Sequence, residues 1–335
     1  MESEINDTIL SVRDLHTRFR TDDGIVRAAD GVSFDLKKGE TLAIVGESGS
    51  GKSATALSLL RLIEPEGGEV LFDGKDILKS PVSEVRKIRG RRISMIFQDP
   101  SASLNPYMPI GEQMAEMTRL HLGHGRREAR EHAIKMLEAV GIPDPHLRID
   151  AHPHEFSGGM RQRAVIAIAL SCDPQILIAD EPTTALDVTI QAQILELIKD
   201  LKERAGTSII LISHDLGIVA GMADSVIVMY AGRVFEQAAT KDLFQRSANP
   251  YTIGLLRSTP DVSDEDGMLY QIPGSPPDLA NLPPGCPFSD RCYRAEEKCR
   301  SEFPPYVEVS PGHRSLCHFA QEVYTDSPRS RSALI

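Results

Sequence analysis

The chain has 335 residues, of which 41% are hydrophobic and 25% are charged, and 37 Lys and Arg against 48 Asp and Glu give a net charge of −11. This composition is typical of a globular protein and not of a disordered one. Proteins that act mainly on nucleic acid need clustered cations. The acidic balance therefore argues against that class, and we expect no nucleic-acid partner.

The sequence also lacks the features of a membrane-spanning or exported chain. Its longest apolar run, Ala164–Leu170, has seven residues, far fewer than the roughly 18 that a spanning helix needs. The first residues, Met1–Ile5, are acidic and contain no apolar stretch of a secretory signal. We therefore expect the chain to stay in the cytosol, where its five cysteines act as thiols or metal ligands rather than as disulfides.

Strand and helix patterns alternate up to about residue 258, which predicts a layered α/β domain. Short, nearly continuous apolar runs are typical of strands buried on both faces, and they occur at residues 41–45, 175–179 and 208–212. Residues 225–229 and 233–236 flank a glycine turn and predict a hairpin.

The stretch from about residue 101 to 165 contains no strand runs and predicts a helical subdomain. Within it, residues 126–140 are amphipathic, and Gly141 follows as a helix stop. Another amphipathic helix is expected after residue 187, because apolar residues recur there at helical spacing and Asp187 is a good capping residue.

After residue 258 the pattern changes. Residues 272–287 contain six prolines and little periodicity, which predicts an extended or looped tail. The expected organisation is therefore one nucleotide-binding domain over residues 1–258 and a C-terminal extension over residues 259–335.

A phosphate-binding loop is predicted between the buried run at 41–45 and the helical pattern that follows it. Residues 46–53 fit G-x-x-x-x-G-K-S/T at every fixed position. Glycines let the backbone N–H groups face the β- and γ-phosphates, the lysine adds a cation, and the last serine is a ligand for Mg²⁺. The expected ATP-binding residues of this phosphate loop are Gly46, Glu47, Ser48, Gly49, Ser50, Gly51, Lys52 and Ser53.

Two carboxylates end the apolar run near residue 178. Parallel strands deliver the residues at their carboxyl ends to the ligand crevice, so Asp180 and Glu181 are expected there. Asp180 would hold Mg²⁺ directly or through water. Glu181 would act as the general base that aligns a water for attack on the γ-phosphate.

Four further segments narrow the family. Gln98 stands at the entry to the helical stretch, residues 156–163 (Phe-Ser-Gly-Gly-Met-Arg-Gln-Arg) open a long helix, residues 185–187 follow the acidic strand, and His214 follows the run 208–212. With the phosphate loop and the acidic strand, these segments resemble an ATP-binding-cassette (ABC) ATPase from about residue 9 to 258, in the family's own order. The resemblance implies an α/β fold, a P-loop ABC ATPase domain with a parallel-sheet core, an antiparallel β subdomain and a helical subdomain.

The resemblance also implies roles for these segments. Gln98 would sense Mg²⁺ and the attacking water and join Ser53 and Asp180 as a Mg²⁺ residue, while His214 would contact the γ-phosphate. Together with Glu181, Gln98 and His214 form the expected catalytic set. The signature residues at the start of the long helix would act on ATP bound by the opposite protomer: Ser157, Gly158 and Gly159. Asp187, from the segment that the family calls the D-loop, is a further expected ATP-binding residue.

Three positions depart from the family pattern. Met160 replaces the usual glutamine after the signature glycines, and Phe156 replaces the leading leucine. Because the serine and both glycines remain, we expect the phosphate contact to be kept. The adenine-stacking aromatic is less clearly marked: Phe19 is the candidate, but the segment after it is longer than the common spacing, and an ordinary core or surface phenylalanine is an equal alternative.

The C-terminal extension carries four cysteines at spacings x5, x6 and x17: Cys286, Cys292, Cys299 and Cys317. These are not the spacings of a zinc ribbon or a standard ferredoxin, so spacing alone leaves a metal site and unrelated thiols open. The extension resembles that of oligopeptide/dipeptide import ATPases, in some of which the cysteines hold a 4Fe–4S cluster. We expect such a cluster, with zinc or no metal as alternatives, and we expect Cys172 to be a core residue.

The predicted function is that of the ATP- and Mg²⁺-dependent ATPase subunit of a di- or oligopeptide importer. The resemblance implies two membrane permease subunits, a second ABC ATPase that is a related chain or a copy of this one, and an external peptide-binding protein as an indirect partner. The chain would then lie at the cytoplasmic face of the inner membrane as a peripheral subunit. Alternatives are import of nickel or another small solute by the same assembly, and a soluble non-transport ABC ATPase.

Overall fold

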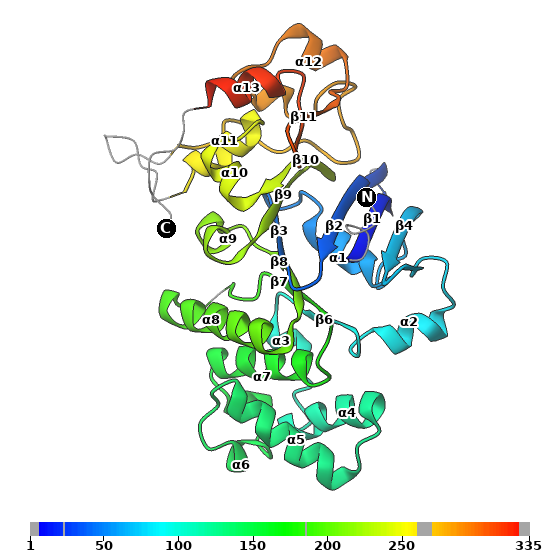
Figure 1. Cartoon of the computed structure of the whole chain (residues 1–335), viewed down its shortest axis with the longest axis vertical. Coiled ribbons are helices and arrows are strands. Elements are labelled where there is room, and N and C mark those ends of the chain that lie inside the picture. Colours follow the sequence, from blue (N-terminus) through cyan, green and yellow to red (C-terminus); the bar gives the residue numbers. More distant parts are fainter. Residues whose placement is uncertain (1–6, 23, 185, 260–269, 328–335) are drawn as a thin grey trace. The chain divides into compact units, whose positions relative to one another are not determined.

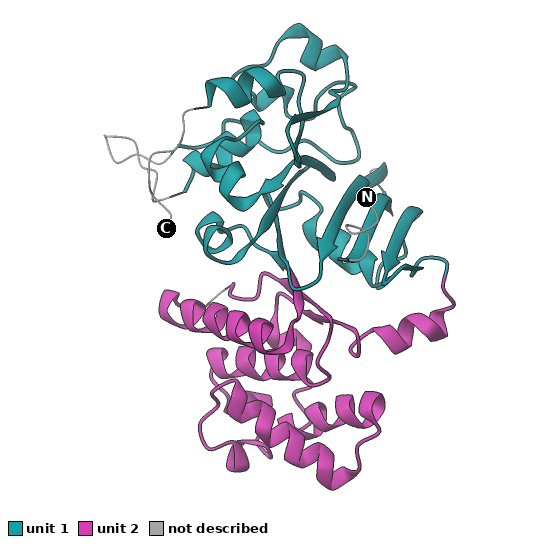
Figure 2. Ribbon diagram, in the orientation of Figure 1, with its two compact units in different colours: residues 1–79, 211–335 teal, residues 80–210 magenta. Residues whose placement is uncertain are grey.

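The computed structural model describes residues 7–22, 24–184, 186–259 and 270–327. The chain forms two compact units, which Figure 2 shows in different colours. Unit 1 comprises residues 1–79 and 211–335, and unit 2 comprises residues 80–210.

The first part of unit 1 holds mainly strands, and its second part alternates helices and strands (Figure 1). The elements before the break are β1 (Thr8–Thr21), β2 (Gly24–Lys37), β3 (Thr41–Val45), α1 (Lys52–Leu59), β4 (Gly67–Phe72) and β5 (Lys75–Asp76). Those after it are α9 (Leu216–Met222), β9 (Ser225–Tyr230), β10 (Arg233–Ala239), α10 (Thr240–Gln245), α11 (Pro250–Arg257), the 3-10 helix η3 (Ser289–Arg291), α12 (Glu297–Ser301), β11 (Tyr306–Ser310), β12 (His313–Leu316) and α13 (Ala320–Asp326).

Unit 2 is mostly helical, and residues 101–165, for which the sequence predicts helices, contain no strand. Its elements are α2 (Val82–Ile88), β6 (Ile93–Ile96), α3 (Pro100–Ser103), α4 (Ile110–Leu122), α5 (Arg126–Ala139), α6 (Pro145–Arg148), the 3-10 helix η1 (Pro153–Glu155), α7 (Gly158–Leu170), β7 (Ile176–Asp180) and α8 (Val188–Ala205). β8 (Ser208–Ile212) is the strand in which the chain passes from unit 2 to unit 1.

Unit 1 contains two sheets. One is antiparallel with strand order β2-β1-β4-β5, and the other runs in the order β11-β12-β10-β9-β3. In the second sheet β3 and β9 are parallel, whereas β9, β10, β12 and β11 pair antiparallel. In unit 2, β6 and β7 are parallel. This is the expected α/β arrangement with an additional antiparallel sheet, and the predicted hairpin at residues 225–236 is confirmed.

The three apolar runs form strands that are buried along their whole length, β3, β7 and β8. The ends of β8 show what fixes it in each unit. The N–H of Ser208 donates to the carbonyl of Gln175 in unit 2 at 2.9 Å, and the N–H of Ser213 donates to the carbonyl of Ile44 in unit 1 at 3.3 Å. Continuous Val, Ile and Leu suit strands covered on both faces.

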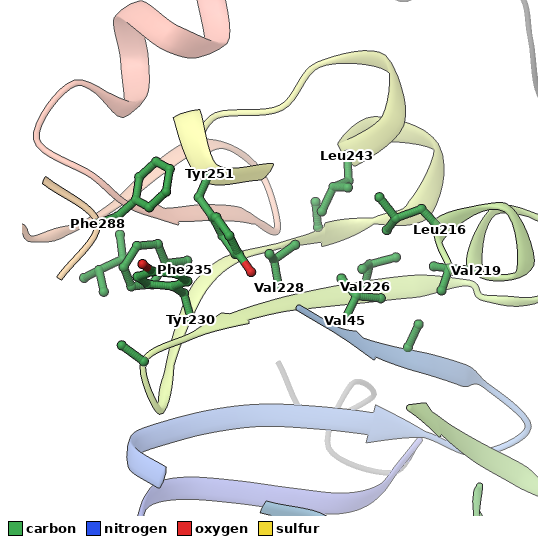
Figure 3. Close-up of a cluster of buried hydrophobic side chains, with 14 residues drawn as sticks. Val45, Leu216, Val219, Val226, Val228, Tyr230, Phe235, Leu243, Tyr251 and Phe288 are labelled. Carbon is green, nitrogen blue, oxygen red and sulfur yellow. The ribbon is translucent and has the colours of Figure 1, made fainter. Parts of the chain in front are cut away.

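The core of unit 1 includes part of the C-terminal extension. Figure 3 shows four aromatic side chains meeting over the sheet, and the ring centroids of Tyr230 and Tyr251 are 4.6 Å apart. Phe288 and Leu316, both from the extension, belong to the same buried cluster as Val45 of β3. Residues 272–287 contain no helix or strand, as predicted. The strands β11 and β12 were not predicted; they place the extension on the sheet of the nucleotide-binding domain.

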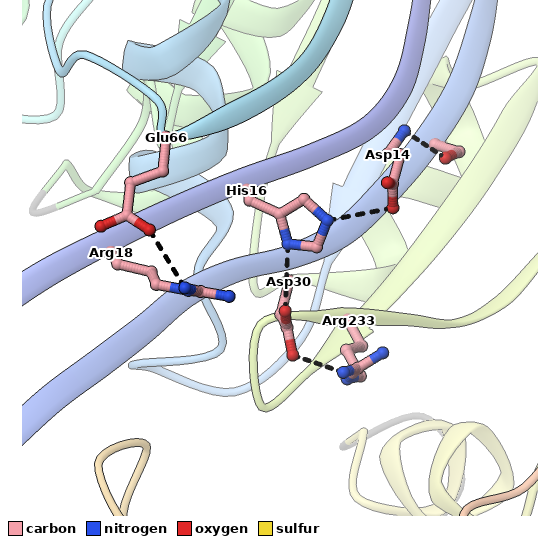
Figure 4. Close-up of polar contacts among 7 residues, drawn as sticks. Asp14, His16, Arg18, Asp30, Glu66 and Arg233 are labelled. Carbon is pink, nitrogen blue, oxygen red and sulfur yellow. Dashed lines mark hydrogen bonds and ion pairs between the residues drawn. The ribbon is translucent and has the colours of Figure 1, made fainter.

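A polar network joins the antiparallel sheet to the β9–β10 turn (Figure 4). His16 lies between the carboxylates of Asp14 and Asp30, each 3.1 Å from a ring nitrogen. Asp30 also pairs with Arg233, and its N–H donates to the carbonyl of Gly232 at 2.8 Å. The start of β10 is thereby tied to β2.

In unit 2, the helix α5 ends where the sequence predicts. The helix α5 stops at Ala139, and Gly141 follows with a φ of 71°. Cys172 is 1% exposed, as expected of a core residue, although it lies beyond the end of α7 and not on that helix. Over the residues that the model describes, no helix has both the length and the apolar character needed to cross a membrane.

Candidate nucleotide site

The phosphate loop in unit 1 connects the end of β3 to the start of α1, as its motif predicts. Two of its glycines are required by space as well as by backbone conformation. A Cβ on Gly46 would lie 2.2 Å from the carbonyl oxygen of Met229, and one on Gly51 would lie 1.9 Å from that of Ala28. Their φ angles of 149° and 100° are also unfavourable for other residues. At these two positions the loop therefore packs against β2 and β9 with no room for a side chain.

Lys52 is buried at the centre of this loop, with 6% of its surface exposed. Its Nζ donates to the carbonyl oxygens of Gly46 at 2.8 Å and Glu47 at 2.9 Å. The hydroxyl of Ser50 is also buried and has no hydrogen-bond partner among the described residues. A cation and a polar hydroxyl held inside a loop of backbone N–H groups suit a phosphate anion.

A cavity of about 340 Å³ opens beside the phosphate loop in unit 1. Its size is within the range of about 300–1,000 Å³ typical of small-molecule sites. It is lined by the start of β2, the phosphate loop, the β9–β10 turn and the C-terminal extension: Val26, Glu47, Ser48, Gly49, Ser50, Tyr230, Ala231, Pro276, Pro277, Asp278 and Leu279. Phe19 lies on β1 opposite Val26, is 37% exposed, and is not among these lining residues. Its predicted adenine contact stays a prediction.

His214 follows β8 in unit 1 and is exposed. The next residue, Asp215, caps α9 by accepting hydrogen bonds from the N–H groups of Gly217 at 2.8 Å and Ile218 at 3.3 Å. This cap holds the backbone next to His214, the predicted γ-phosphate contact.

In unit 2 the two predicted carboxylates end β7. Asp180 is 5% exposed, whereas Glu181 is partly exposed and has a φ of 46°. Such a left-handed conformation is uncommon for a residue other than glycine and recurs at functional sites. The amide of Gln98 donates to Glu181 Oε2 at 3.0 Å, and the hydroxyl of Thr184 donates to the same oxygen at 2.9 Å. The structure thus brings Gln98 and Glu181 together and orients the glutamate.

The signature residues open α7 in unit 2. Ser157 caps this helix by accepting from the N–H of Met160 at 3.3 Å. Ser157 and Gly158 are exposed, and a Cβ on Gly158 would meet nothing within 4 Å. A Cβ on Gly159 would lie 3.0 Å from Ile190 of α8. The start of α7 therefore lies against the first turn of α8.

Asp187 caps α8, as the sequence predicts, by accepting a hydrogen bond from the N–H of Ile190 at 2.9 Å. Its neighbour Ala185, the first residue of the predicted D-loop, lies outside the described residues. The predicted site residues thus form two sets. The phosphate loop, Phe19 and His214 belong to unit 1, while Gln98, Asp180, Glu181, the signature residues and Asp187 belong to unit 2.

The four cysteines of the extension line one small enclosed cavity of about 20 Å³ in unit 1. Burial raises the pKa of Cys286 and of Cys317 to about 12. In the part of the chain that the structure describes, no group of three or more His, Cys, Asp and Glu side chains is arranged to hold a metal ion. The convergence of the four cysteines is therefore observed, whereas their iron–sulfur cluster stays a prediction.

Sequence reasoning missed two residues that contact the phosphate loop. The hydroxyl of Tyr251 accepts a hydrogen bond from the N–H of Glu47 at 2.9 Å. Arg291 donates to the carboxylate of Glu47 and to the hydroxyl of Tyr230. Arg291 and Glu47 are 244 positions apart, so no local spacing marks them as partners.

The sequence matches two family models. The model described as ABC transporter matches residues 29–184, and the one described as Oligopeptide/dipeptide transporter, C-terminal region, matches residues 235–299. Two similar curated proteins are the oligopeptide transport ATP-binding protein OppD of Escherichia coli and the dipeptide transport ATP-binding protein DppD of Bacillus subtilis. Each is 51% identical to this chain. The match covers 93% of this chain and 93% of OppD, and it covers 92% of this chain and 94% of DppD.

Solved structures are similar as well. A dimeric ATP-binding cassette in a post-hydrolysis state, bound to ADP and Pi, has a TM-score of 0.64 and 27% identity, covering 69% of this chain and 98% of the other. The structure of cbiO1 from Clostridium perfringens, part of the ABC transporter complex cbiONQ, has a TM-score of 0.61 and 32% identity, covering 71% of this chain and 91% of that one.

Proposed function

From the premise that this chain belongs to the ABC transporter ATPases with an oligopeptide/dipeptide transporter C-terminal region, we propose that it hydrolyses ATP to power the import of di- or oligopeptides. The observation that carries the proposal is the presence in one chain of both regions, at 51% identity over nearly all of two peptide-transport ATP-binding proteins. The ATPase activity follows from the family; the peptide cargo follows from the relatives' names.

We propose that residues 46–53 bind the phosphates of ATP through backbone N–H groups and Lys52. Ser53, Asp180 and Gln98 would hold Mg²⁺, which neutralises charge on the phosphates when it is bound. The carboxylate of Glu181 would take the proton of the attacking water, and the observed hydrogen bond from Gln98 supports this role because it orients that carboxylate. His214 would contact the γ-phosphate.

We further propose that the chain works in a pair of ABC ATPases. The exposed Ser157 and Gly158 at the start of α7 support this, since a helix N-terminus attracts phosphate and these residues would meet ATP held by the other protomer. Two membrane permease subunits, a second ATPase chain and an external peptide-binding protein would complete the importer. The chain would then be peripheral at the cytoplasmic face of the inner membrane.

Replacing the proposed base tests the catalytic assignment. Glu181→Gln keeps the size of the side chain and removes the proton acceptor, so we expect ATP turnover to fall by at least about 100-fold while ATP binding persists. Turnover is measured with the assembled importer and binding with the chain itself. Thr184→Val, which removes only the neighbouring hydroxyl, is expected to have a much smaller effect on turnover. Turnover of Glu181→Gln like that of the original chain would remove Glu181 from this role.

Peptide transport itself is tested with the importer in sealed vesicles. We expect ATP-dependent uptake of a labelled tripeptide when the permeases, the second ATPase and the binding protein are present, and none with Glu181→Gln. Uptake of nickel or another small solute in place of peptides would contradict the proposed cargo and leave the ATPase assignment intact.

We also propose that Cys286, Cys292, Cys299 and Cys317 hold a 4Fe–4S cluster, which is supported by their convergence on one cavity. Thiolates are the usual ligands of such clusters, and a bound cluster would crosslink the extension. Anaerobic purification is expected to yield a brown protein containing iron and sulfide, and Cys299→Ser is expected to lose both, whereas Cys172→Ser keeps them. A colourless, iron-free protein, with zinc or without metal, would refute the cluster.

A further inference from the structure

Arg291 of the C-terminal extension contacts the phosphate loop directly. Its guanidinium donates to both carboxylate oxygens of Glu47, at 2.6 Å for Nη1–Oε2 and 2.8 Å for Nη2–Oε1. Nη1 also donates to the hydroxyl of Tyr230 at 3.1 Å, and Nε donates to the carbonyl of Pro273 at 2.9 Å. Because two parallel charged hydrogen bonds fix orientation as well as distance, this contact sets the direction of the Glu47 side chain.

The pair is not an ordinary surface salt bridge. The side chain of Arg291 is 6% exposed and that of Glu47 is 26% exposed. Ion pairs that are this little exposed are only weakly screened by salt. Removing one partner would leave the other charge partly buried and unpaired, which is strongly unfavourable.

Every polar group of Glu47 is paired within the chain. Its N–H donates to the hydroxyl of Tyr251, its carbonyl accepts from Lys52, and its carboxylate is paired with Arg291. Tyr251 and Tyr230 in turn pack in the buried aromatic cluster of Figure 3. Residues from α1, α11 and η3 thus hold the start of the phosphate loop. The charge of Glu47 is neutralised next to the proposed site of the phosphates.

The same extension forms a wall of the cavity beside the loop. Residues 276–279 line it together with Val26 of β2, and the N–H of Arg27 donates to the carbonyl of Leu279 at 3.4 Å. Prolines 276 and 277 offer rigid apolar surface, and Asp278 offers a carboxylate. If the phosphates occupy the loop, this adjoining space is left for the base and the ribose.

We propose that the C-terminal extension is a working part of the nucleotide site. Arg291 is a positioning residue that holds Glu47 and the phosphate loop, and residues 276–279 form the wall against the base and ribose of the adenine nucleotide. The inference rests on the proposed function, in which residues 46–53 bind the phosphates of ATP.

Equilibrium binding to the full-length chain tests the positioning role, with MgATP and inorganic tripolyphosphate as probes. Arg291→Met should weaken both by about 10-fold, the factor equivalent to one lost charged hydrogen bond. Adding Glu47→Gln to Arg291→Met removes the unpaired carboxylate and should recover most of the lost affinity. Circular dichroism shows whether both variants fold, so a loss of affinity in the folded Arg291→Met chain reports on the site and not on folding.

Arg300→Met is the matched control, since Arg300 lies in the same extension and its ion pair with Asp290 is exposed on both sides; it should bind both probes like the original chain. Should Arg291→Met fail to fold by circular dichroism, Arg291→Lys replaces it, with an expected loss of about 3-fold because the charge remains without the two parallel bonds. Unchanged affinity in the folded Arg291 variant, or no rescue by Glu47→Gln, would overturn the positioning role.

Photolabelling with 8-azido-ATP tests the wall. Mass spectrometry should find adducts in the peptide that contains residues 276–279 or at Val26, and excess ATP should suppress them; adducts confined to other peptides would overturn this part. Lys52→Ala distinguishes the phosphate site from the positioning role. If it leaves ATP affinity intact, the proposed phosphate site is wrong, whereas if it abolishes binding while Arg291→Met binds normally, only the positioning role of Arg291 is wrong.

Discussion

At the scale of single residues, the phosphate loop depends on glycines that tertiary contacts require. Gly51 precedes α1 in a left-handed conformation, and the carbonyl of Ala28 occupies the space of a Cβ. The motif predicts a glycine here because of the phosphates. The structure adds a second reason, which is that β2 approaches the loop too closely for any side chain.

Gly51→Ala should therefore damage both stability and function. We expect the free energy of unfolding to fall by about 3 kcal/mol or more, because the backbone of the loop and that of β2 must both move. We also expect nucleotide binding to be lost. Denaturant unfolding and ATP binding measure these effects. Gly39→Ala is the control: its φ is 71° but a Cβ there meets nothing within 4 Å, so about 1 kcal/mol is expected. Equal losses for the two variants would contradict this explanation.

At the scale of elements, the residue that caps α11 also joins the sheet of unit 1 to the C-terminal extension. Asn249 caps α11 by accepting from the N–H of Tyr251 at 3.1 Å. Its amide donates to the carbonyls of Phe235 at 3.1 Å and Leu316 at 3.2 Å, so the same residue also links β10 to the end of β12. Asn249 is 2% exposed, so water cannot replace the hydrogen bonds that its amide donates.

Asn249→Asp separates these two roles, because aspartate caps helices as well as asparagine does but has no amide protons. We expect the unfolding free energy to fall by about 2–4 kcal/mol, since a carboxylate would then face two carbonyl oxygens in the core. Thermal and denaturant unfolding check this value. Asp215→Asn, at the exposed cap of α9, should change stability by less than about 0.5 kcal/mol. A similarly small change for Asn249→Asp would mean that the link to β12 contributes nothing.

At the scale of the whole molecule, the C-terminal extension is built into unit 1. β12 pairs with β10, and Phe288 and Leu316 complete the buried cluster. The carboxylate of Glu236, which is 0% exposed, is paired with His313 of the extension at 2.6 Å. Without the extension, an apolar surface and a strand edge would lose their partners, and the buried carboxylate of Glu236 would lose its ion pair with His313.

A chain truncated after residue 258 should therefore be much less stable than the full chain. We expect its Tm to fall by at least about 10 °C, since several kcal/mol are lost and each is worth about 2–4 °C in a chain of this size. The free edge of β10 should also promote self-association. Calorimetry and size-exclusion chromatography test both effects. A truncated chain that stays monomeric and melts like the full chain would show that the extension folds independently.

Local sequence patterns were enough to predict much of the fold and of the candidate site. The buried strands β3, β7 and β8, the helices α5 and α8, the cap at Asp187 and the loop 46–53 follow from hydrophobic periodicity, turn residues and motif spacing, all of which act over a few positions. The alternation of these elements also predicted the mixed α/β architecture. These features depend on residues that are close together in the sequence, so they can be predicted from the sequence alone.

Only the tertiary structure decided the rest. It placed Val26 rather than Phe19 on the cavity, paired Arg291 with Glu47, and added β11 and β12 to the sheet, although these strands are short and partly polar. It also showed that the proline-rich tail lines the cavity beside the phosphate loop. The contacts of Arg291 and of Tyr251 with Glu47 join residues more than 200 positions apart, and their energy comes from burial and paired charge that exist only once the chain has folded.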